Sequence, residues 1–312
     1  MTKKILITGG GGYIGSMLTT QLINEGYFVT VIDLMKYEKS SLNHLFFFNN
    51  FKLIKNDVRN LRLLKKEVIK SDVIIPLAAL VGAPLCEKNK KLAKLINLDH
   101  IKNILKFMKK NQKLIYLNSN SGYGVGKKNS YCDEKSPLNP VSLYGRTKVA
   151  AEKEVCKHKN FICFRLATVF GYSYRMRTDL LVNFFVKESI EKKILSIFEP
   201  HFRRNFIHVK DVVNAIVYSL KNFNKMKNQI YNLGLSSANL TKLQLAKKVK
   251  KVNKKVKINV IKNKKDPDQR DYFVSNARIE KKGFRANLSV EDGINEVFNV
   301  LNNSDKKFIN NY

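Results

Sequence analysis

The sequence predicts an α/β protein in which a doubly wound parallel sheet is joined to a smaller mixed α/β lobe. Two observations indicate this class. The first half of the 312 residues alternates apolar runs of β type with amphipathic stretches of helical period. A glycine-rich stretch, ITGGGGYIGS, lies between the first such run and the first helix. Strands that alternate with helices pair in parallel, and the helices then cover both faces of the sheet.

The elements of this sheet follow one another along the first 170 residues. The first strand, KKILIT, leads into the glycine stretch, and the helix after it runs from about Ile14 to Asn24. Further helices are expected near 60–70, 88–110 and 141–158. The strands between the helices are predicted at residues 28–33, 51–57, 72–79, 113–119 and 161–168.

Beyond Gly171 the alternation becomes less regular, and helices are expected near 178–193, 209–221, 241–251 and 290–302. Two of them carry a start signal, because Thr241 precedes Gln244 and Ser289 precedes Asp292 at the spacing of a capping box. We therefore predict a sheet domain over 1–170 and a second lobe over 171–312, with the segment of about 205–235 packing back on the first domain.

The glycine stretch has the spacing of a dinucleotide-binding loop. Gly10, Gly12 and Gly15 fit G-x-G-x-x-G, and Gly9 with the last two fits a wider spacing. Such glycines let backbone N–H groups approach a pyrophosphate at the N-terminus of the following helix. Asp33 ends the second strand 18 residues after Gly15, where a carboxylate binds an adenosine ribose and repels the 2′-phosphate of NADP. The sequence thus predicts a Rossmann-type sheet that binds NAD.

A second motif, YGRTK, places Tyr144 four residues before Lys148 on one face of a predicted helix. A tyrosine has a pKa of about 10 and is a poor base at neutral pH. A neighbouring ammonium group favours the phenolate, so we expect Lys148 to bring the pKa of Tyr144 toward 7. Ser119, at the end of a predicted strand, supplies a hydroxyl group.

With these motifs the chain resembles, over nearly its whole length, the extended short-chain dehydrogenase/reductase family of nucleotide-sugar epimerases, dehydratases and dehydrogenases. The similarity rests on TGGGGYIG, LAA at 77–79, YGRTK and RRNFIHVKD at 203–211, while Pro76 stands where many members have histidine. The resemblance implies that NAD is bound by Gly9, Gly12, Tyr13, Ile14, Gly15, Asp33, Asp57, Val58, Leu77, Ala78, Ala79, Asn97, Tyr144 and Lys148.

The resemblance also implies the chemistry. Tyr144 would remove a proton from a sugar hydroxyl, usually at C4, while a hydride passes to the nicotinamide. Ser119 would hydrogen-bond the same oxygen, and Lys148 would hold the nicotinamide ribose. The substrate would be a nucleotide-diphosphate sugar, and the residues implied to contact it are Ser119, Asn120, Ser121, Arg175, Arg177, Asn183, Arg204 and Arg270.

Residues 118–124, NSNSGYG, limit the reaction. Dehydratases of the family place Asp-Glu, or a glutamate, directly after the catalytic hydroxyl to eliminate water, whereas Asn120 and Ser121 cannot act as that pair at neutral pH. This argues against a 4,6-dehydratase and leaves oxidation at C4, after which the ketone is released or, as in a 4-epimerase, reduced again. Segments such as RLATVFGYSYRMRTDLLVN resemble members that act on GDP-heptoses. A non-catalytic NAD-bound protein or a nucleic-acid-binding module is disfavoured, because the three catalytic residues are all present.

The formal net charge of +33 has two interpretations. A surface for an anionic partner is one, but the lysines are dispersed along the chain, and lysine and asparagine are both frequent, as in AT-rich coding. We therefore favour solvated helix faces and predict no specific nucleic-acid partner. Arginine supplies only 11 of the 58 basic residues. A position that has arginine instead of lysine therefore indicates a site where the planar guanidinium group binds its partner through two hydrogen bonds.

The remaining expectations concern location and assembly. No apolar run reaches the roughly 18 residues of a membrane span, and the N-terminus lacks the pattern of a signal peptide, which predicts a cytoplasmic protein without a membrane partner. The resemblance implies a homodimer formed by the helices at 88–110 and 141–158. The cysteines lack metal-binding spacing, so we expect no metal and treat them as small hydrophobes: Cys86, Cys132, Cys156 and Cys163.

Overall fold

The structure is a computed structural model that describes residues 3–126, 130–261, 270–304, 308 and 310–311. Its largest element is a seven-stranded sheet with strand order β11-β7-β5-β4-β1-β2-β3, in which every neighbouring pair is parallel. This confirms the predicted fold class. The strands are β1 (Lys4–Thr8), β2 (Phe28–Asp33), β3 (Phe51–Lys55), β4 (Val73–Pro76), β5 (Lys113–Ser119), β7 (Phe161–Leu166) and β11 (Gln229–Leu233).

Side chains alternate between the two faces of the sheet, and each face is covered by helices. On β1, Ile5 and Ile7 join the core beneath one layer, while Leu6 between them joins the core beneath the other. The first layer contains α1 (Tyr13–Asn24) and α8 (Val209–Lys221); the second contains α2 (Leu61–Ile69), α5 (His100–Phe107) and α6 (Leu143–Val155). The strand order reverses at β1, because β2 and β3 follow on one side of it and β4 lies on the other side. Parallel sheets of this kind bind ligands at such a reversal, here in the crevice between the carboxyl ends of β1 and β4.

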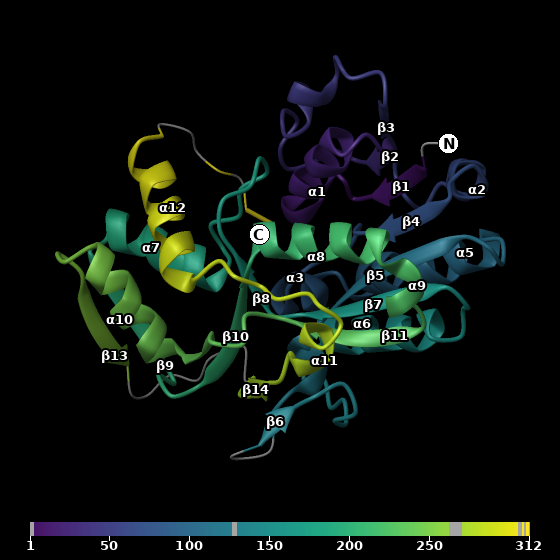
Figure 1. The fold of residues 1–312 in the computed structure, drawn as a ribbon. Helices are drawn as coiled ribbons and strands as arrows, with labels where there is room; N and C mark the ends of the chain where they lie inside the picture. Colours follow the sequence, from purple (N-terminus) through teal and green to yellow (C-terminus); the bar gives the residue numbers. More distant parts are fainter. Residues whose placement is uncertain (1–2, 127–129, 262–269, 305–307, 309, 312) are drawn as a thin grey trace.

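The second lobe has its own apolar core beside this sheet, at the left of Figure 1. It contains α7 (Leu181–Glu191), α10 (Lys242–Val252) and α12 (Val290–Asn302). Capping boxes at Thr241 and Ser289 start the last two helices, as predicted. The lobe's strands are β8 (Thr168–Phe170), β10 (Arg203–His208) and β12 (Asn239–Thr241) in one sheet, with β9 (Ile194–Phe198) and β13 (Lys257–Ile261) in another.

The segment after β10 returns to the large sheet. Helix α8 packs on α1, and β11 pairs with β7 at the sheet edge (Figure 1). The chain therefore crosses between the two parts more than once. The division into domains at residue 170 remains a proposal.

Two predicted elements are interrupted. The strand expected over 161–168 ends at Leu166: Ala167 donates its N–H to the carbonyl of Leu233, and Thr168 then begins β8 beside β10. The helix expected over 88–110 is broken by a π-helical turn, Leu95–Asp99, between α4 (Lys90–Lys94) and α5. The smaller elements are η1 (Asn43–Leu45), α3 (Ala83–Lys88), η3 (Asn120–Tyr123), β6 (Tyr131–Cys132), α9 (Phe223–Met226), β14 (Phe273–Val274) and α11 (Ala277–Glu280).

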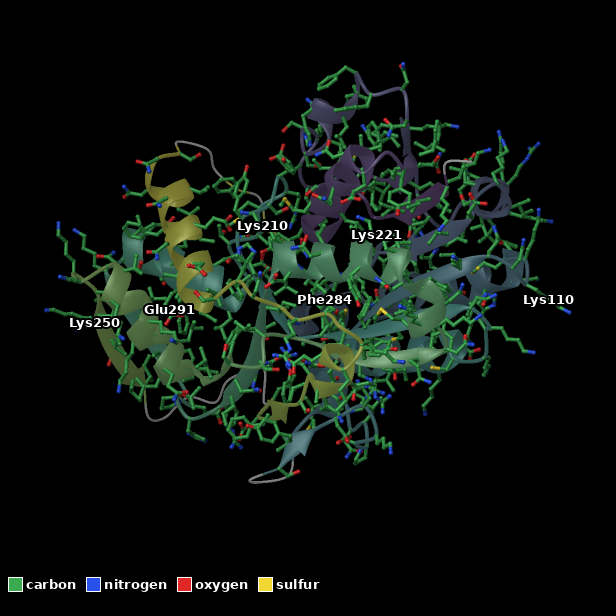
Figure 2. The ribbon with its side chains drawn as sticks, in the orientation of Figure 1. Lys110, Lys210, Lys221, Lys250, Phe284 and Glu291 are labelled. Atoms are coloured by element: carbon green, nitrogen blue, oxygen red, sulfur yellow. The ribbon has the colours of Figure 1, made fainter. Side chains whose placement is uncertain are left out.

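The lysines extend from many elements rather than from one face. Figure 2 labels four exposed lysines that lie far apart in the chain: Lys110, Lys210, Lys221 and Lys250. Lys210 pairs with Glu296, and Lys221 pairs with Glu25 at 2.6 Å. Such exposed pairs contribute little to stability. The spread of the lysines over many elements favours the interpretation of the net charge of +33 as solvated surface.

Among the described residues, no helix is long and apolar enough to cross a membrane. Three of the cysteines are buried and Cys156 is exposed, and none forms a disulfide. Within the same described ranges, no three His, Cys, Asp or Glu side chains converge as a metal site would require.

Candidate active site

The turn between β1 and α1 requires glycine for close packing. Gly9 has a φ of 77°, and a Cβ there would lie 2.5 Å from the backbone nitrogen of Ala78. A Cβ at Gly15 would lie 2.3 Å from the carbonyl oxygen of Gly9. Helix α1 begins after Gly12 without a side-chain cap. Because no side chain accepts from its first N–H groups, these groups can bind an anion.

Asp33 is held in place at the end of β2. Its Oδ2 accepts a hydrogen bond from the N–H of Gly11 at 2.9 Å, and its Oδ1 accepts one from Met35 at 2.7 Å. Burial nevertheless raises the pKa of this carboxyl group, with the two N–H groups and Arg175 acting in the opposite direction. A rigid acceptor beside the glycine loop fits the ribose hydroxyls of NAD.

These groups line one cavity of about 650 Å³, which extends from the glycine loop into the second lobe. Such a volume is typical of a ligand site. All but one of the residues expected to bind NAD line it: Gly9, Gly12, Tyr13, Ile14, Gly15, Asp33, Asp57, Val58, Leu77, Ala78, Ala79, Tyr144 and Lys148. Six of the eight residues expected to contact substrate line it too, namely Ser119, Ser121, Arg175, Arg177, Arg204 and Arg270.

Three asparagines expected at the site do not line the cavity. Asn97, in the π-helical turn, bonds the backbone of Leu80 through N–H···Oδ1 at 2.8 Å and Nδ2···O at 3.0 Å, and so holds the loop after β4. Asn183 is fully buried and bonds the backbones of Gly171 and Arg177. Asn120 is buried, and its amide atoms have no hydrogen-bond partner among the described residues. Asn97 and Asn183 thus hold backbone segments of the cavity wall, and a ligand contact of these three asparagines stays a prediction.

The expected catalytic side chains come from two adjacent elements. Ser119 ends β5, and Tyr144 lies in the first turn of α6, where Ser142 caps the helix by accepting from the N–H of Gly145 at 3.1 Å. Ser119 and Tyr144 both line the cavity, and Ser119 acts to lower the pKa of the Tyr144 phenol. Lys148, one turn later, donates from Nζ to the carbonyl of Leu117 at 2.6 Å. Both side chains therefore face the cavity from one helix.

The pKa of the tyrosine differs from the expectation. Burial raises the pKa of Tyr144 to about 12; Arg270, Arg177 and the hydrogen bond from Ser119 offset part of this. Burial also lowers the pKa of Lys148 to about 8. The rise in the pKa of Tyr144 is opposite to the expected effect of Lys148, because loss of hydration dominates the pKa of the phenol and the ammonium group of Lys148 is bonded to Leu117.

Several lining residues were not predicted. Asp179 forms a two-pronged ion pair with Arg177, which includes Nε–Oδ1 at 3.1 Å. The only sequence signal was the spacing of two residues in RMRTD. Phe184 on α7, Lys242 on α10 and Tyr272 also line the cavity, and they lie too far apart in the chain for any local motif to join them.

The position of the carboxylates limits the chemistry. Among the described residues, those that line the cavity are Asp33, Glu38, Asp57 and Asp179. Asp33 and Asp57 lie at the ends of strands on the cofactor side, and Asp179 is paired with Arg177. The residues that follow Ser119 therefore offer a hydroxyl and an amide but no acid.

Known proteins resemble this chain over most of its length. The sequence model of the NAD dependent epimerase/dehydratase family matches residues 5–234. The UDP-glucose 4-epimerase of Lactobacillus helveticus is 28% identical over 276 residues, which cover 79% of this chain and 81% of that protein. The dTDP-D-glucose 4,6-dehydratase of Bos taurus is 24% identical over 322 residues, covering 94% and 86%.

Solved structures show the same fold. The UDP-glucuronic acid 4-epimerase from Bacillus cereus, in complex with UDP-glucuronic acid and NAD, aligns with a TM-score of 0.84 at 24% identity, covering 96% of this chain and 99% of that one. The dTDP-glucose 4,6-dehydratase from Bacillus anthracis, in complex with NAD, aligns with a TM-score of 0.84 at 22% identity, covering 97% and 98%.

Proposed function

This chain belongs to the NAD dependent epimerase/dehydratase family, and we propose that it oxidises C4 of a nucleotide-diphosphate sugar and releases the 4-keto product. The observation that carries this proposal is that Tyr144 and Ser119 line one cavity, whose described carboxylates lie on the cofactor side or, as at Asp179, in an ion pair. The described residues of the site can therefore polarise a hydroxyl group but include no acid directly after Ser119 to expel one.

The residues act in sequence on one sugar oxygen. Ser119 donates a hydrogen bond to the C4 oxygen, and the phenolate of Tyr144 takes the hydroxyl proton as the C4–H bond breaks. NAD held by the glycine turn and Asp33 would supply the hydride acceptor, so that the alcohol would become a ketone with formation of one NADH and one proton. Arg177 and Arg270 favour the phenolate by their charge. Lys148 is the residue that would hold the nicotinamide ribose.

The sugar nucleotide would lie on the lobe side of the cavity. Arg177, Arg204 and Arg270 line that side, and guanidinium groups suit a diphosphate. Under this assignment residues 1–170 bind NAD and 171–312 bind the sugar nucleotide.

We further propose that the sugar is GDP-D-glycero-α-D-manno-heptose and that its oxidation serves surface (capsule) polysaccharide synthesis. Segments with uncommon residues support this choice, because IIPLAALVGAPLCEKN, RLATVFGYSYRMRTDLLVN and LGLSSANLT resemble GDP-heptose 4-dehydrogenases. A homodimer in the cytoplasm remains part of this proposal.

A 4-epimerase is the second candidate. The L. helveticus relative and the B. cereus structure are both named as 4-epimerases, and the same Ser119, Tyr144 and Lys148 would serve that reaction. The difference is that an epimerase reduces the ketone in place on its other face. A 4,6-dehydratase is less well supported, because Asn120 and Ser121 stand where dehydratases have acids. A non-catalytic NAD-bound protein is also less well supported, because the three catalytic side chains are all present.

Product analysis separates these candidates. Purified protein would be incubated with NAD and GDP-heptose, with UDP-glucose in parallel, and products would be followed by mass spectrometry and by absorbance of NADH. A dehydrogenase gives a 4-keto sugar and stoichiometric NADH. A C4-inverted sugar without net NADH would establish the epimerase, and neither product from any sugar nucleotide would overturn both. The Tyr144→Phe variant serves as the inactive control.

A further inference from the structure

Arg175 reaches the cavity from the side of the cofactor loop. It follows β8 in the chain, and its backbone lies against the first turns of α1, where its N–H donates to Oγ of Ser16 at 3.4 Å. The neighbouring Ser173 donates from Oγ to the carbonyl of Tyr13 at 2.6 Å. These bonds fasten the loop that carries Arg175 to the helix end that follows the glycine turn.

Arg175 is 2% exposed as a residue and still lines the cavity. Its Cζ lies 4.6 Å from the centre of the Tyr37 ring, and its Nη2 donates to Oδ1 of Asn311 at 2.6 Å. Tyr37 follows Asp33 by four residues, and both line the same end of the cavity. The Nε of Arg175 has no hydrogen-bond partner within the described part of the chain.

A buried guanidinium group without an anion is unfavourable. Burial lowers the pKa of Arg175 to about 10, and the charge of Arg177 lowers it further, while Asp179, Tyr37 and Asp33 act in the opposite direction. No carboxylate among the described residues forms an ion pair with it. The chain uses lysine at 47 of its 58 basic positions, so arginine here suits a ligand that accepts two parallel hydrogen bonds.

We infer that Arg175 binds a phosphate of the NAD pyrophosphate beside the N-terminus of α1, and that Asn311 orients its guanidinium group for this contact. The family resemblance implies instead that Arg175 contacts the sugar nucleotide. The unpaired Nε, the neighbouring Asp33 and Tyr37, and the attachment to Ser16 all place it with the cofactor. Because it concerns the cofactor alone, the inference does not depend on which sugar is oxidised.

Binding measurements on the full chain separate the two diphosphates. After bound nucleotide is removed, Arg175→Gln and Arg204→Gln would be titrated calorimetrically with NAD, with ADP and adenosine in the presence of GDP, and with GDP in the presence of saturating NAD. We expect Arg175→Gln to weaken NAD and ADP by about 10- to 100-fold, as a lost charged hydrogen bond implies, and to leave adenosine and GDP unchanged. Arg204→Gln should weaken GDP and leave NAD unchanged.

Two further variants keep the inference open to refutation. Arg175→Lys retains the charge without the planar group, and we expect an intermediate loss of NAD affinity even if Arg175→Gln folds poorly. Asn311→Ala should weaken NAD by a few-fold at most, since it removes only the orienting bond. A fall in GDP affinity with unchanged ADP in the Arg175 variants would overturn the inference, and so would equal losses for adenosine and ADP. A change in GDP binding by Arg204→Gln alone bears on the sugar site and not on Arg175.

Discussion

The cofactor side and the sugar side of the cavity are built in different ways. The cofactor side consists of short, contiguous pieces at the ends of neighbouring strands, such as the glycine turn after β1 and Asp33 after β2. The side that we assign to the sugar nucleotide is assembled from separate segments that contribute Arg177, Arg204, Lys242 and Arg270. Backbone geometry therefore defines the first side, whereas long side chains brought together by tertiary packing define the second. The two sides should respond differently to substitution.

The largest effect is expected where the two sides meet. Tyr144→Phe removes the only base that we assign, so the rate of oxidation should fall by about 10²- to 10⁴-fold. The affinities for NAD and for the sugar nucleotide should both remain, because the ring still fills its place. Single-turnover formation of NADH measures the rate, and calorimetry measures the two affinities. Near-normal oxidation in this variant would remove Tyr144 from the mechanism.

The dependence of the rate on pH comes next. With the pKa of Tyr144 at about 12, the active phenolate is the minor form at neutral pH and becomes more abundant as the pH rises. The single-turnover rate should therefore rise about tenfold per pH unit between roughly pH 6 and 9. A plateau that begins near pH 7 would show instead that the phenol titrates where the sequence alone had suggested. The rate of NADH formation across this range, at saturating substrate, is the measurement.

A smaller and one-sided effect is expected at the cofactor end. Asp33→Asn removes a charge that excludes the 2′-phosphate of NADP, and it weakens the acceptor held by the N–H groups of Gly11 and Met35. NAD affinity should fall by about 10- to 100-fold, and the preference for NAD over NADP should decrease. GDP affinity serves as the control and should stay unchanged. An altered GDP affinity with unaltered NAD would contradict the separation of the two sides.

The smallest effect compares helix caps in the two parts of the molecule. Thr241 caps α10 in the lobe, and Asn60 caps α2 on the sheet by accepting from the N–H of Leu63 at 3.1 Å. Replacing either by alanine should lower the free energy of unfolding by about 1 kcal/mol. Thr241→Ser is the matched control and should lose little. Denaturant titration followed by circular dichroism measures the change in the free energy of unfolding. A loss at Thr241 well above that expected for one cap would indicate that the start of α10 is coupled more tightly to the lobe core.

Much of the fold and of the cofactor side could be predicted because the information is local. The glycine turn, the strand before it and Asp33 lie within about one βαβ unit, and their spacing follows from backbone geometry. The capping boxes at Thr241 and Ser289 are likewise read within four residues.

The remaining site residues depend on contacts between distant segments. Arg175 and Asn311 are 136 residues apart, and nothing near Arg175 in the chain indicates that Tyr37 lies against its guanidinium group. Asn183 belongs to a motif that suggests ligand contact, yet its amide group is hydrogen-bonded to the backbones of Gly171 and Arg177. Burial, which is the largest influence on the pKa of Tyr144, also depends on the whole folded chain rather than on a motif.

The return of α8 and β11 to the large sheet limits how such a protein can be divided. A piece ending at residue 170 would expose the edge of β7 and the apolar face that α8 covers on α1, and exposed edges and faces of this kind favour aggregation. The C-terminal part would in turn carry a strand and a helix without their sheet. Exchanging everything after one junction with a relative would therefore not transfer sugar specificity as an intact module. New specificity in this architecture has to arise by substitutions within a continuous, interwoven chain.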